Sequence, residues 1–446
     1  MHTNSANGRH WMFAALLASF CVVYLSWYPP TYGIMDEGVT LALSYSIDGG
    51  SIFPDHAGPG AGLLVNGHIV SKFSPLHAAI LAPAFRLNWR LAFLVAAGFF
   101  VIGAFVVRAW LCAEHLSEDW SALYFLLAGS LYYTQTVMAA VPAAVTGLAG
   151  VWLLMRQTSR PMLAGLAFGV SVLLHPWMAP FVAVITSVWA VESWLSVSTA
   201  KQYAGRSSAI SSEGPRDGGS RHCEASASSC AKASRRAGTL FVGALPSIAF
   251  IGGYNFFTTG NPFHNAYNLL PTSGLFAGPH LCAFLSFYLL SLAIFPIAGW
   301  AAFSPRWCHG WAIPAASIAV MLLASLYYYR DGFSVPPVVG STASLMAGVI
   351  PGQRFLLPVS MLACIPAARF LDSRASAIPR WLRKSARPLA LGIFIAIFAA
   401  MSVVHSSLLR AHAAVQTALC RNFSADARIV VSEDLLKEMA PICKVY

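Results

Sequence analysis

Long apolar runs recur along the whole sequence, and they constrain the fold more than any other feature. A helix that crosses the hydrocarbon core of a bilayer needs roughly 17–25 mainly apolar residues. The candidate runs are 11–28, 89–111, 120–136, 138–155, 161–175, 177–197, 239–258, 281–303, 311–328, 352–370 and 389–408. Because 57% of the residues are hydrophobic and only 10% are charged, the composition excludes an ordinary soluble domain. We therefore predict an all-α polytopic membrane protein with about eleven transmembrane helices.

The distribution of Lys and Arg predicts the orientation of these helices. With a cytoplasmic N-terminus, the cytoplasmic segments hold Arg9, Arg156, Arg160, a basic cluster at 201–236, Arg306 and a second cluster at 369–387. The opposite loops hold Lys72, Arg86, Arg90, Arg330 and Arg354. Basic loops remain in the cytoplasm, so the net charge of +11 is a topology signal and does not indicate nucleic-acid binding. This pattern requires a helix boundary at Pro176.

The remaining segments divide the chain into one transmembrane domain, 1–408, and a short outer tail, 409–446. Within the domain we expect a first outer loop at 29–88 and a disordered cytoplasmic insertion at 200–238, whose Ser, Gly, Ala and Arg residues cannot bury a core. In an oxidising compartment the tail's two cysteines, Cys420 and Cys443, would either pair or stay free.

The first outer loop concentrates the scarce charges, because Asp36, Glu37, Asp48, Asp55 and Lys72 all lie within it. Ionisable groups near a bilayer are expensive, so such a cluster indicates function. From 37 to 47 the apolar spacing predicts a short interfacial helix with Asp36 and Glu37 at its N-terminal end. A purely structural alternative is that Asp36 only caps this helix. Further on, Asn66-Gly67 predicts a tight turn.

Taken in order, the fragments of this loop resemble the first periplasmic loop of the GT-C class of membrane glycosyltransferases, in the protein mannosyltransferase-like branch. These fragments are Asp36-Glu37, Tyr45 within the short helix, Gly49-Gly50, and the run Ser71-Lys72-Phe73-Ser74-Pro75. Three further stretches are similar to elements of the same class. They are the Gly-rich run from Leu163 to His175-Pro176, the run from Tyr254-Asn255 through Asn261 to Tyr267, and the run from Pro351 through Arg354 to Pro358.

The resemblance implies a GT-C-like fold and transfer of a sugar from a polyprenyl-phosphate donor to a lipid, polysaccharide or protein acceptor at the outer face. Such chemistry needs a base for the acceptor proton and cations for the departing phosphate. Asp36 is the candidate base, with Glu37 as the alternative. Lys72 and Arg354 are the candidate phosphate ligands, or else cations that snorkel to the interface. The candidate substrate contacts are Tyr32, Tyr45, His56, His175, Asn261 and Tyr267.

A divalent metal is the one cofactor that these residue types suggest. Outer histidines together with Asp36 or Asp55 are chemically suited to it, but no pair has the i, i+4 spacing of a helical metal site, so we assign no metal ligand. Relatives in the GT-C class commonly carry an acid between the third and fourth helices, and 135–144 contains none. This departure weakens a two-carboxylate mechanism and leaves a catalytically inactive scaffold open.

A transporter or lipid flippase is the rival from another class. Carriers usually place ionisable residues in the middle of helices, whereas the acids here cluster at one surface, which favours an enzyme. Cysteine usage and charge distribution suit a bacterial inner membrane, with the site facing the periplasm. The expected partners are a polyprenyl-phosphate-linked sugar, membrane lipids and a glycan, lipid or protein acceptor.

Overall fold

A computed structural model describes residues 11–32, 35–54, 62–65, 67–71, 73–156, 159–191, 219–264, 357–374 and 380–425 of the chain. The elements before the cluster of central helices are α1 (Trp11–Ser26), α2 (Met35–Asp48), β1 (Gly62–Val65), β2 (His68–Ser71) and α3 (Pro75–Phe85). Then follow η2 (Trp89–Ala92), α4 (Phe93–Ala113), η3 (Glu118–Ser121), α5 (Ala122–Phe125), α6 (Ala128–Thr134), α7 (Ala140–Met155) and α8 (Pro161–Leu174). The last are α10 (Gly219–Thr259), α15 (Leu357–Arg374) and α16 (Arg380–Ala425).

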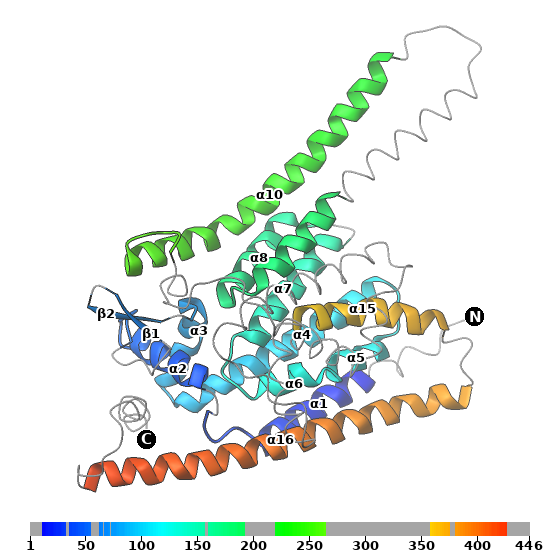
Figure 1. Ribbon diagram of the computed structural model, residues 1–446. Coiled ribbons are helices and arrows are strands. Elements are labelled where there is room, and N and C mark those ends of the chain that lie inside the picture. The colour runs from blue at the N-terminus through cyan, green and yellow to red at the C-terminus, as the bar shows by residue number, and fades with distance from the viewer. Residues whose placement is uncertain are drawn as a thin grey trace, which may run out of the picture.

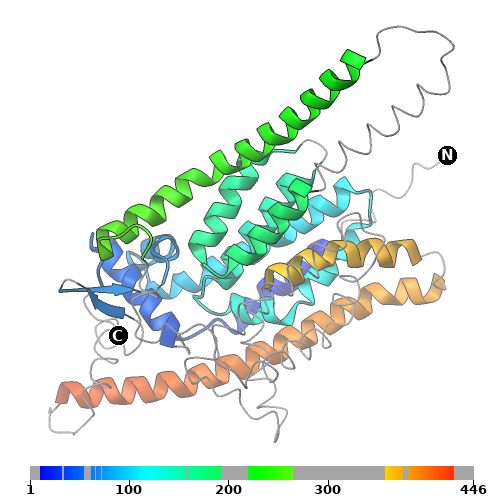
Figure 2. The same cartoon turned by 45° about the horizontal axis from the view of Figure 1, so that its top comes forward.

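The helices form one elongated body in which α10 and α16 lie on opposite sides (Figure 1). Between them lie α8, α7, α4 and α1, and the same arrangement is visible after rotation (Figure 2). We call the end that carries α2, β1, β2 and α3 the hairpin end. At the opposite end, α1 and α16 begin and α15 ends, and we call it the ion-pair end. The rise of α4 separates the two ends by about 30 Å.

Three described helices are long and apolar enough to cross a bilayer: Trp89–Ala113, Ser234–Thr259 and Ser385–Ala411. Shorter apolar helices occupy Trp11–Ser26, Pro75–Phe85, Ala140–Met155, Pro161–Leu174 and Met178–Val191. The predicted runs 281–303 and 311–328 and the start of 352–370 lie outside the described residues. Several apolar helices therefore make this a multi-pass membrane protein, while the number eleven stays a prediction.

The boundary predicted at Pro176 is confirmed. Helix α8 ends at Leu174, and His175 has an extended backbone with φ −149° and ψ 109°. A residue that precedes proline avoids the helical conformation because the proline ring clashes with it. A new helix then covers Met178–Val191.

The structure differs from the sequence interpretation in three helices. The run 120–136 is interrupted, because Leu127 adopts φ −76° and ψ 91° between α5 and α6. Helix α10 begins at Gly219, so residues 219–238 of the expected disordered insertion are helical, and the rest of the insertion lies outside the described residues. Between Ser220 and Ala237 the sequence has neither Gly nor Pro, which permits a continuous helix. Helix α16 likewise continues to Ala425, into the predicted tail.

Aromatic side chains join helices that are distant in sequence. Phe20 of α1 lies parallel to Phe398 of α16, with ring centroids 5.2 Å apart, and also stacks on Phe100 of α4 at 4.8 Å. Phe125 of α5 packs edge-on against Phe100 and against Phe394. These rings are almost fully buried, and large aromatic side chains contribute much of the contact area in such a core.

Helices α8 and α10 meet through glycines. A Cβ atom added to Gly165 would lie 1.9 Å from the Leu240 carbonyl oxygen, and one added to Gly243 would lie 2.0 Å from that of Met162. Small residues let the backbones of membrane helices approach this closely. Any larger side chain at either position would push the two helices apart.

Candidate active site

The short helix expected after Asp36 is present as α2, and the described segments after it lie at the hairpin end. Strands β1 and β2 pair antiparallel, with Val65 opposite His68. The turn between them contains Gly67 with φ +79°, a conformation that glycine adopts readily, as Asn-Gly predicts. An ion pair of 2.8 Å between Arg86 and Asp48 joins the C-terminal end of α2 to the residue that follows α3.

The Ser-Lys-Phe-Ser-Pro run forms the turn from β2 into α3. Ser71 ends the strand, and its hydroxyl oxygen accepts a hydrogen bond of 3.0 Å from the Phe73 amide. Pro75 begins the helix, a position at which proline's missing N–H has no cost. Lys72, between them, lies outside the described residues. The run is therefore a strand-to-helix turn that brings two serines close to the helix start.

A cavity of about 420 Å³ lies beside this turn, between α8 and α10. Its walls are mainly apolar, with Phe168 and Val172 from α8 and Ile248 and Ile251 from α10. Three of the stretches singled out in the sequence contribute to its lining. The contributing residues are Ser71, Phe73, Ser74 and Pro75 of the turn, Pro176 after α8, and Tyr254 and Asn255 of α10.

Polar groups of this lining come from the turn and from the last turns of α10, apart from Ser247. The Ser74 hydroxyl and the Tyr254 hydroxyl are both buried, and within the described part of the chain neither has a hydrogen-bond partner. A buried hydroxyl without a partner is costly unless a ligand or water satisfies it. The cavity thus combines an apolar surface with two lining residues whose hydroxyls lack a partner among the described residues, which suits a ligand with a hydrocarbon chain and a polar head.

Glu37 lies in the first turn of α2 and is buried, with 1% of its surface exposed. Its Oε1 atom accepts a hydrogen bond of 2.8 Å from the backbone amide of Val137, in the turn between α6 and α7. For Asp36, one position earlier in α2, the structure describes the backbone alone. Tyr32 covers the same turn, since a Cβ atom on Gly38 would lie 3.0 Å from its ring.

His77 of α3 also contacts Val137. Its Nε2 atom lies 2.7 Å from the Val137 carbonyl oxygen, and only 3% of the residue is exposed. Because α3 has 11 residues, it is too short to span a bilayer. Burial lowers the pKa of His77 from its usual 6.5 to about 4, so the ring is neutral at pH 7. A carbonyl oxygen only accepts, so the neutral ring carries its proton on Nε2.

The other described candidates play local roles in the structure. Tyr45 is exposed and packs edge-on against Phe85 at 5.9 Å. His175 is half-buried beside Pro176 of the cavity lining. Asn261 accepts a 2.9 Å hydrogen bond from the Phe263 amide and so shapes the turn after α10. His56, Tyr267 and Arg354 lie outside the described residues.

Two features of this end do not follow from the sequence reasoning. From the sequence, His77 is only one of the outer histidines. A lone histidine two residues after Pro75 in an apolar helix is nevertheless a recognisable signal of a buried polar contact. At the α6–α7 turn, where an acid was expected and none occurs, Gln135 donates a hydrogen bond to Ser402 of α16 and the His405 ring packs on Tyr132 at 5.1 Å. Among the described residues, no three His, Cys, Asp or Glu side chains gather as metal ligands.

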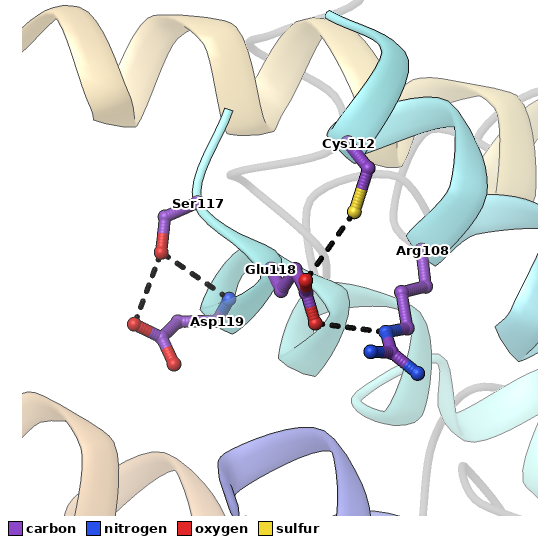
Figure 3. A network of polar contacts seen from close by, with 5 residues as sticks. All are labelled: Arg108, Cys112, Ser117, Glu118 and Asp119. Atoms are coloured by element: carbon purple, nitrogen blue, oxygen red, sulfur yellow. Dashed lines mark hydrogen bonds and ion pairs between the residues drawn. The ribbon is translucent and has the colours of Figure 1, made fainter. Parts of the chain in front are cut away.

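The ion-pair end carries a separate polar network. Arg108 of α4 pairs with Glu118 of η3 at 2.8 Å, and the Cys112 thiol lies 3.4 Å from the same carboxylate (Figure 3). The Ser117 hydroxyl accepts a hydrogen bond from the Asp119 amide at the start of η3 and donates one to the Asp119 carboxylate. The same carboxylate also pairs with Arg387 of α16. Further along, Arg369 of α15 makes a two-pronged contact with Glu114. This network joins helices at the end opposite the cavity.

Comparison with known proteins finds similarity only in structure. No protein-family model matches the sequence, and no curated protein sequence matches it significantly. The crystal structure of ArnT from Cupriavidus metallidurans bound to undecaprenyl phosphate has a TM-score of 0.52 at 13% identity, and the match covers 98% of this chain and 85% of that one. For ArnT in the apo state the TM-score is 0.50 at 13% identity, with 91% and 77% covered.

An oligosaccharyltransferase from Archaeoglobus fulgidus also matches, with a TM-score of 0.43, 11% identity, and 91% and 57% of the two chains covered. At 13% identity the likeness to ArnT concerns the fold. Function has to be argued from the site, because one fold hosts many activities. The chain is a multi-pass membrane protein with the GT-C-like fold that its sequence resembles, and this fold extends over most of its length.

Proposed function

We propose that the protein is a membrane glycosyltransferase that takes a sugar from a polyprenyl-phosphate donor and transfers it to a lipid, polysaccharide or protein acceptor. One observation carries the proposal: three stretches that stand out in the sequence alone line the same apolar cavity of about 420 Å³. A cavity of this size with apolar walls and a few polar groups is typical of a small-molecule site. The donor's prenyl chain would lie between α8 and α10, with its phosphate near the Ser71–Pro75 turn.

The fold supports the same assignment. ArnT, which shares the fold, has been crystallised with undecaprenyl phosphate, a lipid of the proposed donor class. Lys72 lies in the sequence between Ser71 and Phe73, which line the cavity, and a Lys ammonium is a suitable point charge for a phosphate. Arg354 is the second proposed phosphate ligand. Burying a prenyl chain stabilises the complex by about 0.8 kcal/mol per CH₂ group removed from water.

Asp36 is the proposed base, since Glu37 is buried and its Oε1 atom is already hydrogen-bonded to a backbone amide. Asp36 would take the proton of the acceptor hydroxyl while the acceptor oxygen forms a bond to the anomeric carbon. The bond between that carbon and the phosphate oxygen then breaks, and the electron pair leaves with the polyprenyl phosphate. Lys72 and Arg354 would stabilise the negative charge that develops there. Attack opposite the leaving group inverts the anomeric centre.

Replacing Asp36 tests this assignment. We expect Asp36→Asn to abolish transfer from radiolabelled polyprenyl-phosphate sugars, because an amide cannot take the acceptor proton. Asp48→Asn is the matched control: it makes the same change in the same helix, at a residue that pairs with the exposed Arg86. The control should keep wild-type transfer. Full activity of Asp36→Asn would show that another group is the base.

The product of the reaction identifies both the sugar and the acceptor. Cells with and without the gene should differ in one membrane glycolipid or envelope polysaccharide, identified by mass spectrometry. If the purified protein binds undecaprenyl phosphate but transfers no sugar from any polyprenyl-phosphate donor, it is a binding scaffold with this fold. We place the protein in a bacterial inner membrane, with the hairpin end facing the periplasm.

A further inference from the structure

We propose that Glu37 and His77 are positioning residues, which bind opposite sides of one residue, Val137, and thereby fix the first turn of α2 against the α6–α7 turn. The inference rests on the proposed function, in which Asp36 of that same first turn is the base. It assigns to Glu37 a role different from the catalytic one that its sequence position suggested.

The geometry consists of two hydrogen bonds to one backbone residue. Glu37 Oε1 accepts from the Val137 amide at 2.8 Å, and His77 Nε2 lies 2.7 Å from the Val137 carbonyl oxygen. Val137 belongs to neither helix, since α6 ends at Thr134 and α7 begins at Ala140. Segments from α2, α3 and the α6–α7 turn, which are 60 and 100 positions apart in the chain, therefore meet at this residue.

Packing reinforces the same arrangement. The Val137 side chain is buried in a cluster with Leu41 of α2, Leu81 of α3 and Phe93 of α4. Its amide and carbonyl are held by side chains while its own side chain fills the contact, so the turn cannot shift without breaking polar and apolar contacts together. A hydrogen bond between buried groups is costly to break, because each group would lose its partner without regaining water.

A positioning role fits this geometry better than proton transfer by Glu37. Adjacent positions of an α-helix differ in direction by about 100°, so positions 36 and 37 face different surroundings. Position 37 faces the protein interior, where its carboxylate contacts a backbone amide and is covered from water. A misplacement of a reacting group by about 1 Å lowers a rate by about 100-fold. Fixing the first turn of α2 is therefore a requirement of the proposed reaction.

Variants that keep the hydrogen bond to Val137 but cannot exchange a proton separate positioning from catalysis. In Glu37→Gln the amide oxygen can still accept from the Val137 amide, but the side chain can no longer act as a base. In His77→Gln the side-chain N–H can still donate to the Val137 carbonyl, but no titrating group remains. In contrast, Glu37→Leu and His77→Leu remove the hydrogen bonds and keep the apolar volume.

The experiment uses the full chain in detergent or vesicles and measures two properties of each variant. The first is kcat and KM for the polyprenyl-phosphate sugar, and the second is hydrogen exchange of the α2 amides. Glu37→Gln and His77→Gln should keep kcat within about fivefold of wild type, and the α2 amides should stay protected from hydrogen exchange. Glu37→Leu should lower kcat by about 100-fold with little change in the donor KM, because the donor cavity lies at α8 and α10, and should expose α2 to exchange.

Ser44→Ala is the control, because Ser44 is buried in α2 but its hydroxyl donates only within its own helix, to Thr40 at 2.7 Å. It should leave both measurements unchanged. Loss of activity in Glu37→Gln with α2 still protected would make Glu37 catalytic and overturn the proposal. So would wild-type kcat and wild-type protection in Glu37→Leu. If the wild-type protein transfers no sugar at all, the proposed function fails, and the exchange data alone decide whether Glu37 and His77 hold α2.

Discussion

The two ends of the helical body use polar side chains in opposite ways. At the ion-pair end, Arg108, Arg369 and Arg387 pair with Glu118, Glu114 and Asp119, and their side chains stay partly exposed. At the hairpin end, Glu37 and His77 are almost fully buried and bind the backbone of Val137. At the ion-pair end charged side chains pair with one another, whereas at the hairpin end two buried side chains bind one peptide group and the Arg86–Asp48 pair lies at the surface.

The difference shows which end needs an exact geometry. Long Arg side chains that remain partly in water tolerate small movements, and each such pair contributes little. A buried side chain that binds a peptide group has few alternative partners, so its loss is costly and its position is fixed. The ion-pair end is suited to holding helices together, and the hairpin end is suited to fixing the first turn of α2 against the α6–α7 turn.

The largest difference between the ends should appear on acidification. Burial lowers the pKa of His77 to about 4, whereas the unfolded chain keeps the usual 6.5. Between these values the unfolded state binds a proton that the native state does not, so stability falls as pH falls from 6.5 and the loss is complete below about pH 4. The loss is about 3 kcal/mol. Thermal unfolding in detergent at pH 7 and pH 4.5 should show a smaller pH effect for His77→Gln than for wild type.

A pH response that is equal in wild type and His77→Gln would contradict this prediction. Arg369→Met serves as the comparison variant from the other end, because it changes no histidine. It should keep the wild-type response to acid.

A smaller effect is expected from breaking the strongest contact of the ion-pair end. Arg369→Met keeps the apolar stem and removes both prongs from the Glu114 carboxylate, which keeps the 2.8 Å hydrogen bond from the Trp110 indole. We expect a loss of about 1–2 kcal/mol, since a two-pronged Arg–carboxylate pair is stronger than an ordinary surface pair. A double-mutant cycle with Glu114→Gln measures the coupling. A coupling energy near zero would show that the pair holds nothing together.

The smallest effect should come from salt. At 1 M salt the Debye length falls to about 3 Å, which screens partly exposed pairs and leaves buried contacts nearly unaffected. We expect the wild type to lose about 0.5 kcal/mol between low and high salt, and the Arg369→Met/Glu114→Gln variant to lose less. Glu37→Gln should respond as the wild type does. A salt response that depends on Glu37 instead would contradict this prediction.

Local features of the fold could be predicted from the sequence because neighbouring residues determine them. Pro176 ends a helix through its own ring, Gly67 permits a tight turn, and the apolar spacing after Asp36 forms α2. Periodicity did not reveal the break at Leu127, because the run 120–136 contains neither a proline nor a charged residue to mark it. Composition likewise gave the wrong picture for residues 219–238, since Ser, Ala and Arg allow a helix as readily as a coil.

The long-range contacts of the site could not be predicted in this way. Nothing in the sequence around Glu37 indicates a bond to an amide 100 positions away, and no pattern joins Arg369 to a carboxylate 255 positions earlier. The cavity does bring together three of the stretches that stand out in the sequence. Their convergence depends on how α8 packs on α10, which is a property of the folded chain.

That packing also makes the walls of the cavity differ in how they are held. Gly165 and Gly243 bring two backbones into direct contact, so α8 and α10 behave as a single plate with no side-chain layer in which to slide. The remaining lining comes from Ala179 and Val182 of the helix after Pro176 and from Ser71, Phe73, Ser74 and Pro75, which follow a two-stranded hairpin. The proposed donor lipid would therefore lie between a direct backbone contact of two helices and a turn that a two-stranded hairpin supports.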